Sequence, residues 1–510
     1  MSRLIHAYIS TTLRYSMLAL TALIITAQLV FLWQEPGGFT AVTGALVLIA
    51  CAVLLRKSIA VPQKRAVPVL LSIGLAVRII SLVGIPNQQV SDFQIYHELA
   101  SAMADGQGFA YTGTTGLQED VAIYLNNAKA KPPLPTAFRP VGYPAMLSVI
   151  YRIFGANPLY GKLFNLLLSL IAGICVYYLL LPIHRETAFF GSLLWLIYPT
   201  NILAANLLGT ELPFAVALLA GTVLIGRISD TRTPADIIFA VTAGLLFGLA
   251  TLIRPGLFIA ACGAVALCIP DLPLRRKALL VLMFIICFAV MPALWGVRNY
   301  NRFGKFRVQS TNVGIELLKR TPDMSEKLRH SERYGLLVRK FNESSDEFQR
   351  SALASKIALI HFRAALKHYG IPGFFRSVLV PNFTHAWKKD SAILAWCSNS
   401  EFYSLRRPDS LSPLSARSKS LLQTVTHAGY LCVCLCALAG CFLLRKEWTP
   451  GTVCLAVYLL ISALLSALFF GKPRFHFAPM TALFVFAGYF LSVLFRSDTS
   501  GTSAKHEDMK

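Results

Sequence analysis

The sequence AVPVLLSIGLAVRIISLVGIPNQQVSDFQIYHELA, residues 66–100, contains an apolar segment followed directly by a polar one. In the apolar part, 66–85, Arg78 is the only charged residue. A membrane-spanning helix needs about 20 mostly apolar residues, so this part is long enough to cross a bilayer. The polar part carries acidic residues, the first of them Asp92. The stretch therefore predicts a membrane span that leads into a polar helix at one membrane face.

The polar part has the pattern of a short helix over about residues 92–104. Ser91 and Gln94 are three residues apart and form a capping-box pattern. Asp92 would lie in the first turn, where the helix dipole favours an ionised carboxylate, and Tyr96 would share its face. Two interpretations of Asp92 stay open: a reactive carboxylate, or an acid that only helps to cap the helix.

The composition of the whole chain is that of a membrane protein. Apolar residues make up 55% of the 510 residues, charged residues only 14%, and the mean hydropathy is +0.58. A soluble domain has about 25% charged residues, so this chain cannot cover itself with a water-facing surface. The composition excludes a soluble enzyme, a disordered chain and a secreted disulfide-rich protein.

Apolar runs long enough to cross a membrane recur along the chain. We expect about twelve such helices, near residues 15–33, 39–55, 66–85, 160–181, 187–205, 210–226, 235–253, 256–270, 278–297, 421–444, 450–470 and 477–495. The sequence thus predicts an all-α integral membrane protein.

The short loops between these spans predict the orientation, because Lys and Arg collect on the cytoplasmic side. With the N-terminus in the cytoplasm, the inner segments hold seventeen Lys and Arg. The short outer segments hold only Arg254, Lys472 and Arg474. The two long segments, 86–159 and 298–420, then lie outside.

This topology divides the chain into five regions. They are two N-terminal helices (1–65), a transmembrane core (66–297) with a first external loop (86–159), a basic external segment (298–420), the C-terminal helices (421–496) and a cytoplasmic tail (497–510). The basic external segment has 22 Lys and Arg against 10 Asp and Glu. It should attract anions such as phosphate-bearing membrane lipids or glycans, with a solvated basic face as the alternative.

Several motifs of soluble enzymes are absent from the sequence. It contains no GxxxxGK[ST], no GxGxxG after a strand, no CxxC, no HExxH and no DxD. We therefore expect neither a nucleotide-using active site nor a nucleic-acid partner, and no residues can be named as metal ligands.

Charged residues gather instead near the outer ends of the predicted spans. Charge at membrane depth is costly and marks a functional site by default. One acid, Glu211, and five arginines have this placement: Arg78, Arg139, Arg254, Arg298 and Arg474. Arg139 could simply extend to the membrane surface, but together the arginines predict an anion site at the outer leaflet.

The order and spacing of these residues resemble the GT-C superfamily of membrane glycosyltransferases. The nearest groups are the protein O-mannosyltransferases (family 39) and the lipid A aminoarabinose transferases. The similar motifs cover about 66–310 and 474–479; they are Arg78, Asp92…Tyr96, Gly106-Gln107-Gly108-Phe109, Phe138-Arg139-Pro140…Gly142-Tyr143-Pro144, Phe154-Gly155, Thr210-Glu211, Leu252-Ile253-Arg254-Pro255, and Pro292…Trp295…Arg298-Asn299-Tyr300…Phe303-Gly304.

The resemblance implies a GT-C-type bundle and a polyprenyl-phosphate-linked sugar as donor. It implies that Asp92 is the catalytic acid, Glu211 a second acid and Arg139 a donor-phosphate ligand. The remaining candidates are the phosphate-binding arginines Arg78, Arg254, Arg298 and Arg474, and the substrate contacts Tyr96, His97 and Tyr143. The chain departs from the family in its two extra N-terminal spans. It also has Phe138 where the aminoarabinose transferase has an acid, which leaves a divalent metal unsupported.

The expected function is sugar transfer on the periplasmic or lumenal side, with a bacterial inner membrane as the expected location. A base takes the proton of the acceptor, cations stabilise the leaving phosphate, and direct displacement inverts the anomeric centre. A glycan, lipid A or a protein hydroxyl could be the acceptor. An O-antigen polymerase or ligase and a lipid or sugar transporter are the alternatives.

Overall fold

The structure is a computed structural model that describes residues 2–35, 37–55, 65–112, 133–231, 233–398, 414–443, 448–469 and 471–495. The expected cytoplasmic tail, 497–510, lies outside these ranges, as do parts of both long external segments.

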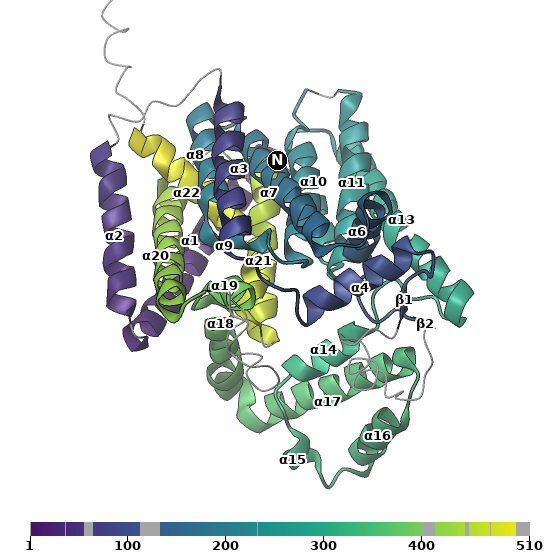
Figure 1. Ribbon diagram of the computed structural model, residues 1–510. Helices are drawn as coiled ribbons and strands as arrows, with labels where there is room; N and C mark the ends of the chain where they lie inside the picture. The colour runs from purple at the N-terminus through teal and green to yellow at the C-terminus, as the bar shows by residue number, and fades with distance from the viewer. Residues whose placement is uncertain are drawn as a thin grey trace, which may run out of the picture.

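Long apolar helices form the body of the protein (Figure 1). A helix satisfies its own backbone hydrogen bonds, which an apolar segment in lipid requires. These helices are α1 (Ser2–Gln34), α2 (Gly38–Leu55), α3 (Ala66–Gly84), α7 (Pro158–Leu180), α8 (Arg185–Ile197), α9 (Pro199–Ala204), α10 (Glu211–Gly226), α11 (Ala235–Ile253), α12 (Ile259–Leu267), α13 (Leu274–Phe303), α20 (Ala416–Leu443), α21 (Pro450–Leu468) and α22 (Met480–Phe495).

All twelve predicted spans coincide with apolar helices in the described part of the chain. Seven helices are long and apolar enough to cross a membrane by themselves. Helices α8 and α9 form a pair with a 58° bend at Pro199, and the count becomes eight when this pair is taken as one span. Helices α2, α10 and α22 are shorter apolar helices, and α12 has only nine residues. The chain is a multi-pass helical membrane protein.

Small residues allow neighbouring spans to pack closely. Gly244 and Gly248 lie four residues apart on α11 and face α13. A Cβ at these positions would come within 2.4 Å of the Phe284 carbonyl oxygen and 2.5 Å of the Phe288 carbonyl oxygen. Two backbones approach this closely only where no side chain intervenes, as is common between helices in membranes.

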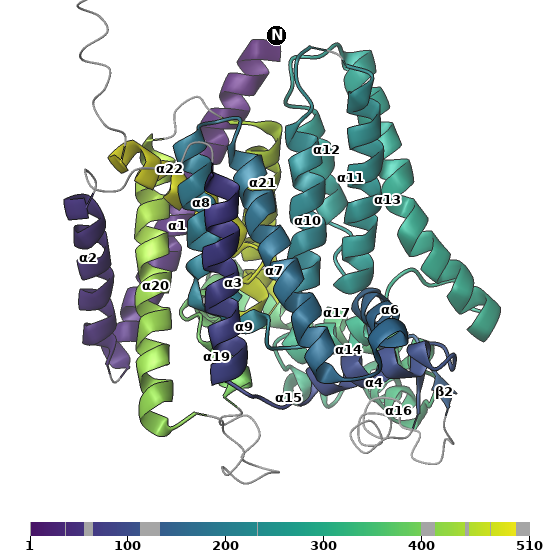
Figure 2. The ribbon, with the colours of Figure 1, turned by 45° about the horizontal axis from the view of Figure 1, so that its top comes forward.

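Shorter helices and a two-stranded sheet cover one end of the bundle. In Figure 2 they lie opposite the N-terminal end of α1, and we call this end of the bundle the α4 end. The elements there are α4 (Asp92–Ala104), β1 (Ala110–Tyr111), β2 (Leu134–Pro135), α6 (Gly142–Phe154), α14 (Asn312–Arg320), α15 (Ser325–Leu328), α16 (Glu332–Glu343), α17 (Glu347–Phe374), the π-helix η1 (Phe375–Leu379), α18 (Val380–Trp387), α19 (Ala392–Cys397) and the 3₁₀ helix η3 (Pro473–His476).

Backbone hydrogen bonds join the helices of the basic external segment to the first external loop. Strand β1 pairs antiparallel with β2, with Ala110 opposite Pro135. Beyond β2, the Thr311 N–H donates to the Ala137 carbonyl at 2.9 Å. The half-buried Glu347 carboxylate at the start of α17 accepts from the Ala137 N–H at 2.8 Å. The segment that leads to Arg139 is therefore held from the α14–α17 side.

Candidate active site

Helix α4 begins with an unusual turn that places Asp92 at its first position. Ser91 has φ 53° and ψ −131°, the only positive φ of a non-glycine residue in the described chain. The Phe93 N–H donates to the Val90 carbonyl at 3.2 Å, which closes the turn. The helix bounds agree with the predicted 92–104, but the predicted capping box is wrong. The Ser91 side chain makes no hydrogen bond to the first turn of the helix, and the Gln94 side chain donates to the Glu98 carboxylate instead.

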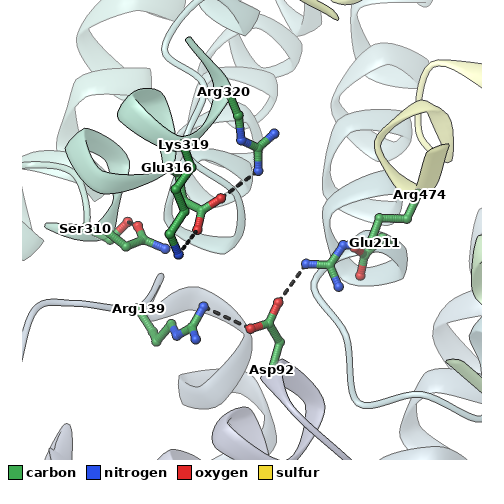
Figure 3. Close-up of polar contacts among 9 residues, drawn as sticks. Asp92, Arg139, Glu211, Ser310, Glu316, Lys319, Arg320 and Arg474 are labelled. Carbon is green, nitrogen blue, oxygen red and sulfur yellow. Dashed lines mark hydrogen bonds and ion pairs between the residues drawn. The ribbon is translucent and has the colours of Figure 1, made fainter. Parts of the chain in front are cut away.

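Two arginines from distant segments bind the Asp92 carboxylate (Figure 3). Arg139, before α6, places Nη1 3.0 Å from Oδ1, and Arg474, in η3, places Nη2 2.6 Å from Oδ2. Burial alone would raise the pKa of Asp92. The charges of Arg139 and Arg474 outweigh burial and hold the pKa well below its usual range. Asp92 is therefore ionised and accepts charge-assisted bonds at both oxygens.

Glu211 is the second acid of the site and opens α10. Its Oε1 lies 3.3 Å from Arg254 Nη1 and 3.7 Å from Arg474 Nε, so Arg474 bridges both acids. The carboxylate lies at a helix N-terminus, where the dipole favours negative charge. Gly209 leaves the space for it, since a Cβ there would lie 2.6 Å from Glu211 Oε2.

Phe475 joins the two acids to the external helices. The Arg254 guanidinium lies 4.8 Å from the centre of its ring, and that of Arg320, at the end of α14, lies 4.3 Å away. Cations over an aromatic face are stabilised by the ring quadrupole. Phe475 thus keeps two positive groups near the same ring. Sequence reasoning missed this role, although Phe475 stands beside the predicted Arg474.

Helix α14 adds three more charges that sequence reasoning did not assign to the site. Arg320 Nη2 lies 2.8 Å from Glu316 Oε2, and Lys319 Nζ lies 3.6 Å from Glu316 Oε1. Lys472, before η3, interacts electrostatically with Asp92, Glu316, Arg320 and Arg474. In Figure 3, Lys319 and Arg320 lie across from Arg139 and Arg474. The only sequence signal for the charges of α14 is the basic composition of 298–420.

The structure does not bring Arg78 and Arg298 into this cluster. Arg78 is fully buried in α3, where it donates to Ser169 Oγ at 2.8 Å and the Leu196 carbonyl at 2.9 Å. It lies six residues before the end of α3, about 9 Å along the helix. Arg298 donates to the Thr136 carbonyl at 2.8 Å. Arg78 thus lies within the bundle, whereas Arg298 lies at the α4 end but binds the backbone beside β1 and β2 instead of Asp92 or Glu211.

The three aromatic or histidine candidates have different surroundings. Tyr96 interacts electrostatically with Asp92, and burial, with a contribution from that charge, raises its pKa to about 12. Tyr143 packs edge-on against Tyr96 and donates to Asn165 Oδ1 at 3.1 Å. His97 lies on another side of α4, with Nδ1 2.7 Å from the Tyr151 hydroxyl. Tyr96 thus interacts with both acids and Tyr143 with Glu211, whereas His97 contacts Tyr151.

A buried network fixes the loop that carries Arg474. His476 Nε2 lies 2.8 Å from Asp390 Oδ1, and His476 Nδ1 lies 2.8 Å from the Ala386 carbonyl oxygen. The two nitrogens of the ring thus link the Asp390 carboxyl group to the backbone at Ala386. The hydroxyls of Tyr198 and Thr200 donate to Asp390 Oδ2 at 2.5 and 2.7 Å. Sequence reasoning missed this network, whose members are far apart in the chain.

The residues of the site do not fit a divalent metal. The described residues contain no group of three or more His, Cys, Asp and Glu side chains that could hold one. The carboxylates of Asp92 and Glu211 face guanidinium groups, and the surrounding side chains are mostly cationic. A metal cation would be repelled by this environment, so we assign no step to one.

The sequence matches no protein-family model and no curated protein. Among solved structures, the chain is similar to ArnT from Cupriavidus metallidurans bound to undecaprenyl phosphate, with 15% identity and a TM-score of 0.37. That similarity covers 85% of this chain and 78% of the other.

The chain is also similar to the oligosaccharyltransferase AglB from Archaeoglobus fulgidus. The complex with an inhibitory peptide and dolichol-phosphate has 14% identity and a TM-score of 0.42, covering 84% of this chain and 50% of that one. The apo form has 14% identity and a TM-score of 0.44 and covers 84% and 51%. The chain thus spans about half the length of the archaeal enzyme. The solved structures to which it is similar have the GT-C fold.

Proposed function

We propose that this protein is a membrane glycosyltransferase that moves a sugar from a polyprenyl-phosphate-linked donor to a hydroxyl acceptor. The observation that carries the proposal is the ionised Asp92 carboxylate between Arg139 and Arg474 at the α4 end of the bundle. Such a transfer needs a base for the acceptor proton and cations for the leaving phosphate. The site brings both together at the end of a membrane-spanning bundle, where a lipid-borne phosphate can reach them.

In the proposed reaction, Asp92 is the general base. The acceptor oxygen attacks the anomeric carbon, the bond from that carbon to the phosphate oxygen breaks, and the acceptor proton passes to Asp92. The polyprenyl phosphate leaves with the electron pair of the broken bond. A single displacement of this kind inverts the anomeric centre. Glu211 keeps Arg254 and Arg474 in place through its own ion pairs.

Arg139 and Arg474 have two roles in this scheme, because a phosphate competes with Asp92 for them. Guanidinium groups bind phosphate oxygens in pairs and stay charged at all relevant pH values. When the donor phosphate binds, it takes over part of their interaction with Asp92. The Asp92 carboxylate then becomes a stronger base than in the free protein. Donor binding would thus prepare the base for the acceptor.

The active site is proposed to face the periplasm of a bacterial inner membrane. The seventeen-to-three asymmetry of Lys and Arg in the short loops supports this side for the 86–159 and 298–420 segments. A glycan, lipid A or a protein hydroxyl remains the proposed class of acceptor. We also propose that the chain is divided into the five regions expected from its sequence.

The proposal is tested by supplying the purified protein with a radiolabelled undecaprenyl-phosphate sugar and a hydroxyl acceptor. Wild-type protein should transfer the label. Arg139→Gln should lower kcat/KM by about 10- to 100-fold, since a charged hydrogen bond contributes about 1.5–3 kcal/mol. Arg333→Gln, an exposed arginine on α16, is the matched control and should leave kcat/KM unchanged. Equal rates for Arg139→Gln and wild type would remove Arg139 from the donor site.

A polymerase or ligase for lipid-linked glycans is the second candidate. The observation in its favour is that Lys319 and Arg320, from the basic external segment, lie across from Asp92 in the site. Such an enzyme would transfer a preformed oligosaccharide in one step. Supplying mono- and oligosaccharide donors side by side, and measuring product mass, distinguishes the two functions.

A further inference from the structure

The charged groups of the site form two sets that lie across from one another in Figure 3. In the first set, Arg139 and Arg474 bind Asp92. In the second set, Lys319 and Arg320 bind Glu316 on α14. The two sets come from different parts of the chain, yet they are close enough to interact, since Arg320 is repelled by Arg254 and Arg474.

Lys472 stands between the two sets. It interacts electrostatically with Asp92 of the first set and with Glu316 and Arg320 of the second. Burial, together with the nearby Arg474 and Arg320, lowers the pKa of Lys472. The protein therefore places a further cation where positive charge is already concentrated, an arrangement that a bound anion would relieve.

The site has more positive charge than its acids can balance. Among the described residues of the two sets and of the Glu211–Arg254 pair, counted together with Lys472, six side chains are cationic and three are carboxylates. The excess is three positive charges. The phosphodiester of a polyprenyl-phosphate sugar carries a single negative charge, and the Asp92-binding arginines already suit it. The remaining excess lies on the α14 side of the site.

The aromatic contacts also indicate an anion site on the α14 side. The guanidinium groups of Arg254 and Arg320 lie near one ring, that of Phe475, although they repel each other. Phe475 and the Glu316 ion pair therefore hold Arg320 in a position that charge repulsion alone would disfavour. Cations held in this way are preorganised for an anion, which lowers the cost of binding.

We propose that Lys319, Arg320 and Lys472 form a second phosphate subsite, distinct from the subsite for the phosphate that carries the transferred sugar. This inference rests on the proposed function and extends it to the class of substrate. The second phosphate has two possible sources, a diphosphate-linked donor or a phosphate group on the acceptor. In both cases the reacting pair brings more than one phosphate to the α4 end of the bundle.

Binding measurements with the full chain in nanodiscs test the subsite. The first comparison is undecaprenyl phosphate against undecaprenyl diphosphate. The second, with undecaprenyl phosphate present, is lipid A against dephosphorylated lipid A. Wild-type protein should prefer the ligand with the additional phosphate about 10-fold or more in one of the two comparisons. A preference in the first comparison assigns the second phosphate to the donor, and a preference in the second assigns it to the acceptor.

The variants Lys319→Gln and Lys472→Gln should reduce that preference by about 10-fold while changing the Kd for undecaprenyl phosphate by less than about 3-fold. Lys340→Gln, an exposed lysine on α16, is the control and should keep the full preference. Lys319 has a half-exposed side chain, so its variant keeps the test valid if Lys472→Gln does not fold.

Two outcomes overturn the inference. One is a wild-type protein without either preference, and the other is a preference that both lysine variants retain. The proposed function fails in a different way, namely if the wild-type protein does not bind undecaprenyl phosphate at all or binds it independently of Arg139. The same titrations therefore distinguish a failure of this inference from a failure of the proposed function.

Discussion

Asp92 differs at the residue scale from an ordinary acid in the first turn of a helix. Its sequence position suggests a charge that a helix dipole stabilises slightly. The structure adds ion pairs to Arg139 and Arg474, which come from segments 47 and 382 residues away in the chain. A neutral side chain at this position would therefore affect stability as well as catalysis, because two guanidinium groups would lose their counter-charge.

Asp92→Asn should lower the transfer rate by about 10²–10⁴-fold, since an amide cannot accept the acceptor proton. It should also lower the Tm. The free energy of unfolding should fall by more than the helix-dipole contribution of about 0.3–1 kcal/mol, because two ion pairs are lost as well. Both quantities are measured on purified protein, with Asp105→Asn, an exposed acid just after the same helix, as the control. A folded Asp92→Asn protein with more than about a tenth of wild-type activity would exclude Asp92 as the base.

The pH dependence of stability should report the depressed pKa of Asp92. A carboxyl group with a lowered folded-state pKa stabilises the protein above its unfolded pKa, about 3.9, and loses this contribution as the pH falls through the folded value. The difference in Tm between wild type and Asp92→Asn should therefore stay constant from pH 8 to about pH 5 and shrink below about pH 4. A difference that shrinks already near pH 6 would contradict the ion-paired state of Asp92.

At the scale of elements, the site depends on the short helix η3 and its anchor. Arg474 and Phe475 lie in η3, and His476, the last residue of η3, is buried against Asp390. The rings of Trp387 and Tyr430 stack on His476 at 5.3 Å each. These contacts fix the loop so that Arg474 can bridge Asp92 and Glu211.

Asp390→Asn should destabilise the protein by about 1–3 kcal/mol, because an amide cannot replace all the buried contacts that the carboxyl group makes with His476, Tyr198 and Thr200. In the fraction that folds, the Kd for undecaprenyl phosphate should rise, since Arg474 is no longer held in place. His476→Gln with Asp390→Asn replaces both partners of the contact and should recover part of the lost Tm. Thermal melts and lipid binding measure the two effects. An Asp390→Asn protein with wild-type Tm and wild-type Kd for undecaprenyl phosphate would show that other contacts hold η3.

At the scale of the whole molecule, α4, α6 and the α14–α17 helices share one end of the bundle, opposite the N-terminal end of α1 (Figure 2). This arrangement agrees with the expectation that 86–159 and 298–420 lie on the same side. It also explains why the charges of the site come from segments far apart in the chain, from Asp92 to Arg474. A bundle brings the ends of distant helices together at one membrane face.

A His330→Cys variant tests which compartment this end faces. Position 330 is exposed and precedes α16, and the positive-inside asymmetry predicts that it lies outside the cytoplasm. A membrane-impermeant maleimide should label it in intact cells or spheroplasts. The unmodified protein is the control for labelling of its own cysteines. Labelling that requires lysis would reverse the topology and place the site in the cytoplasm.

The sequence alone determined the class and the coarse layout of this protein. Apolar runs of about 20 residues must form helices in lipid, so all twelve segments were predictable from composition and length. The helix 92–104 was also predictable, because its signals are local. Asp92, Arg139, Glu211, Arg254 and Arg474 stood out because charge near a span end is rare. The apolar runs beside them in the sequence distinguish these charges from the others.

The tertiary structure alone decided which of these charges meet. Arg78 and Arg298 have the same sequence signal as Arg139, yet both bind backbone carbonyls elsewhere. Glu316, Lys319 and Arg320 look like ordinary surface charges of a basic segment, and only the docking of α14 brings them across from Asp92. An ion pair depends on distances of 3 to 4 Å in space, and no local pattern encodes contacts between residues hundreds of positions apart.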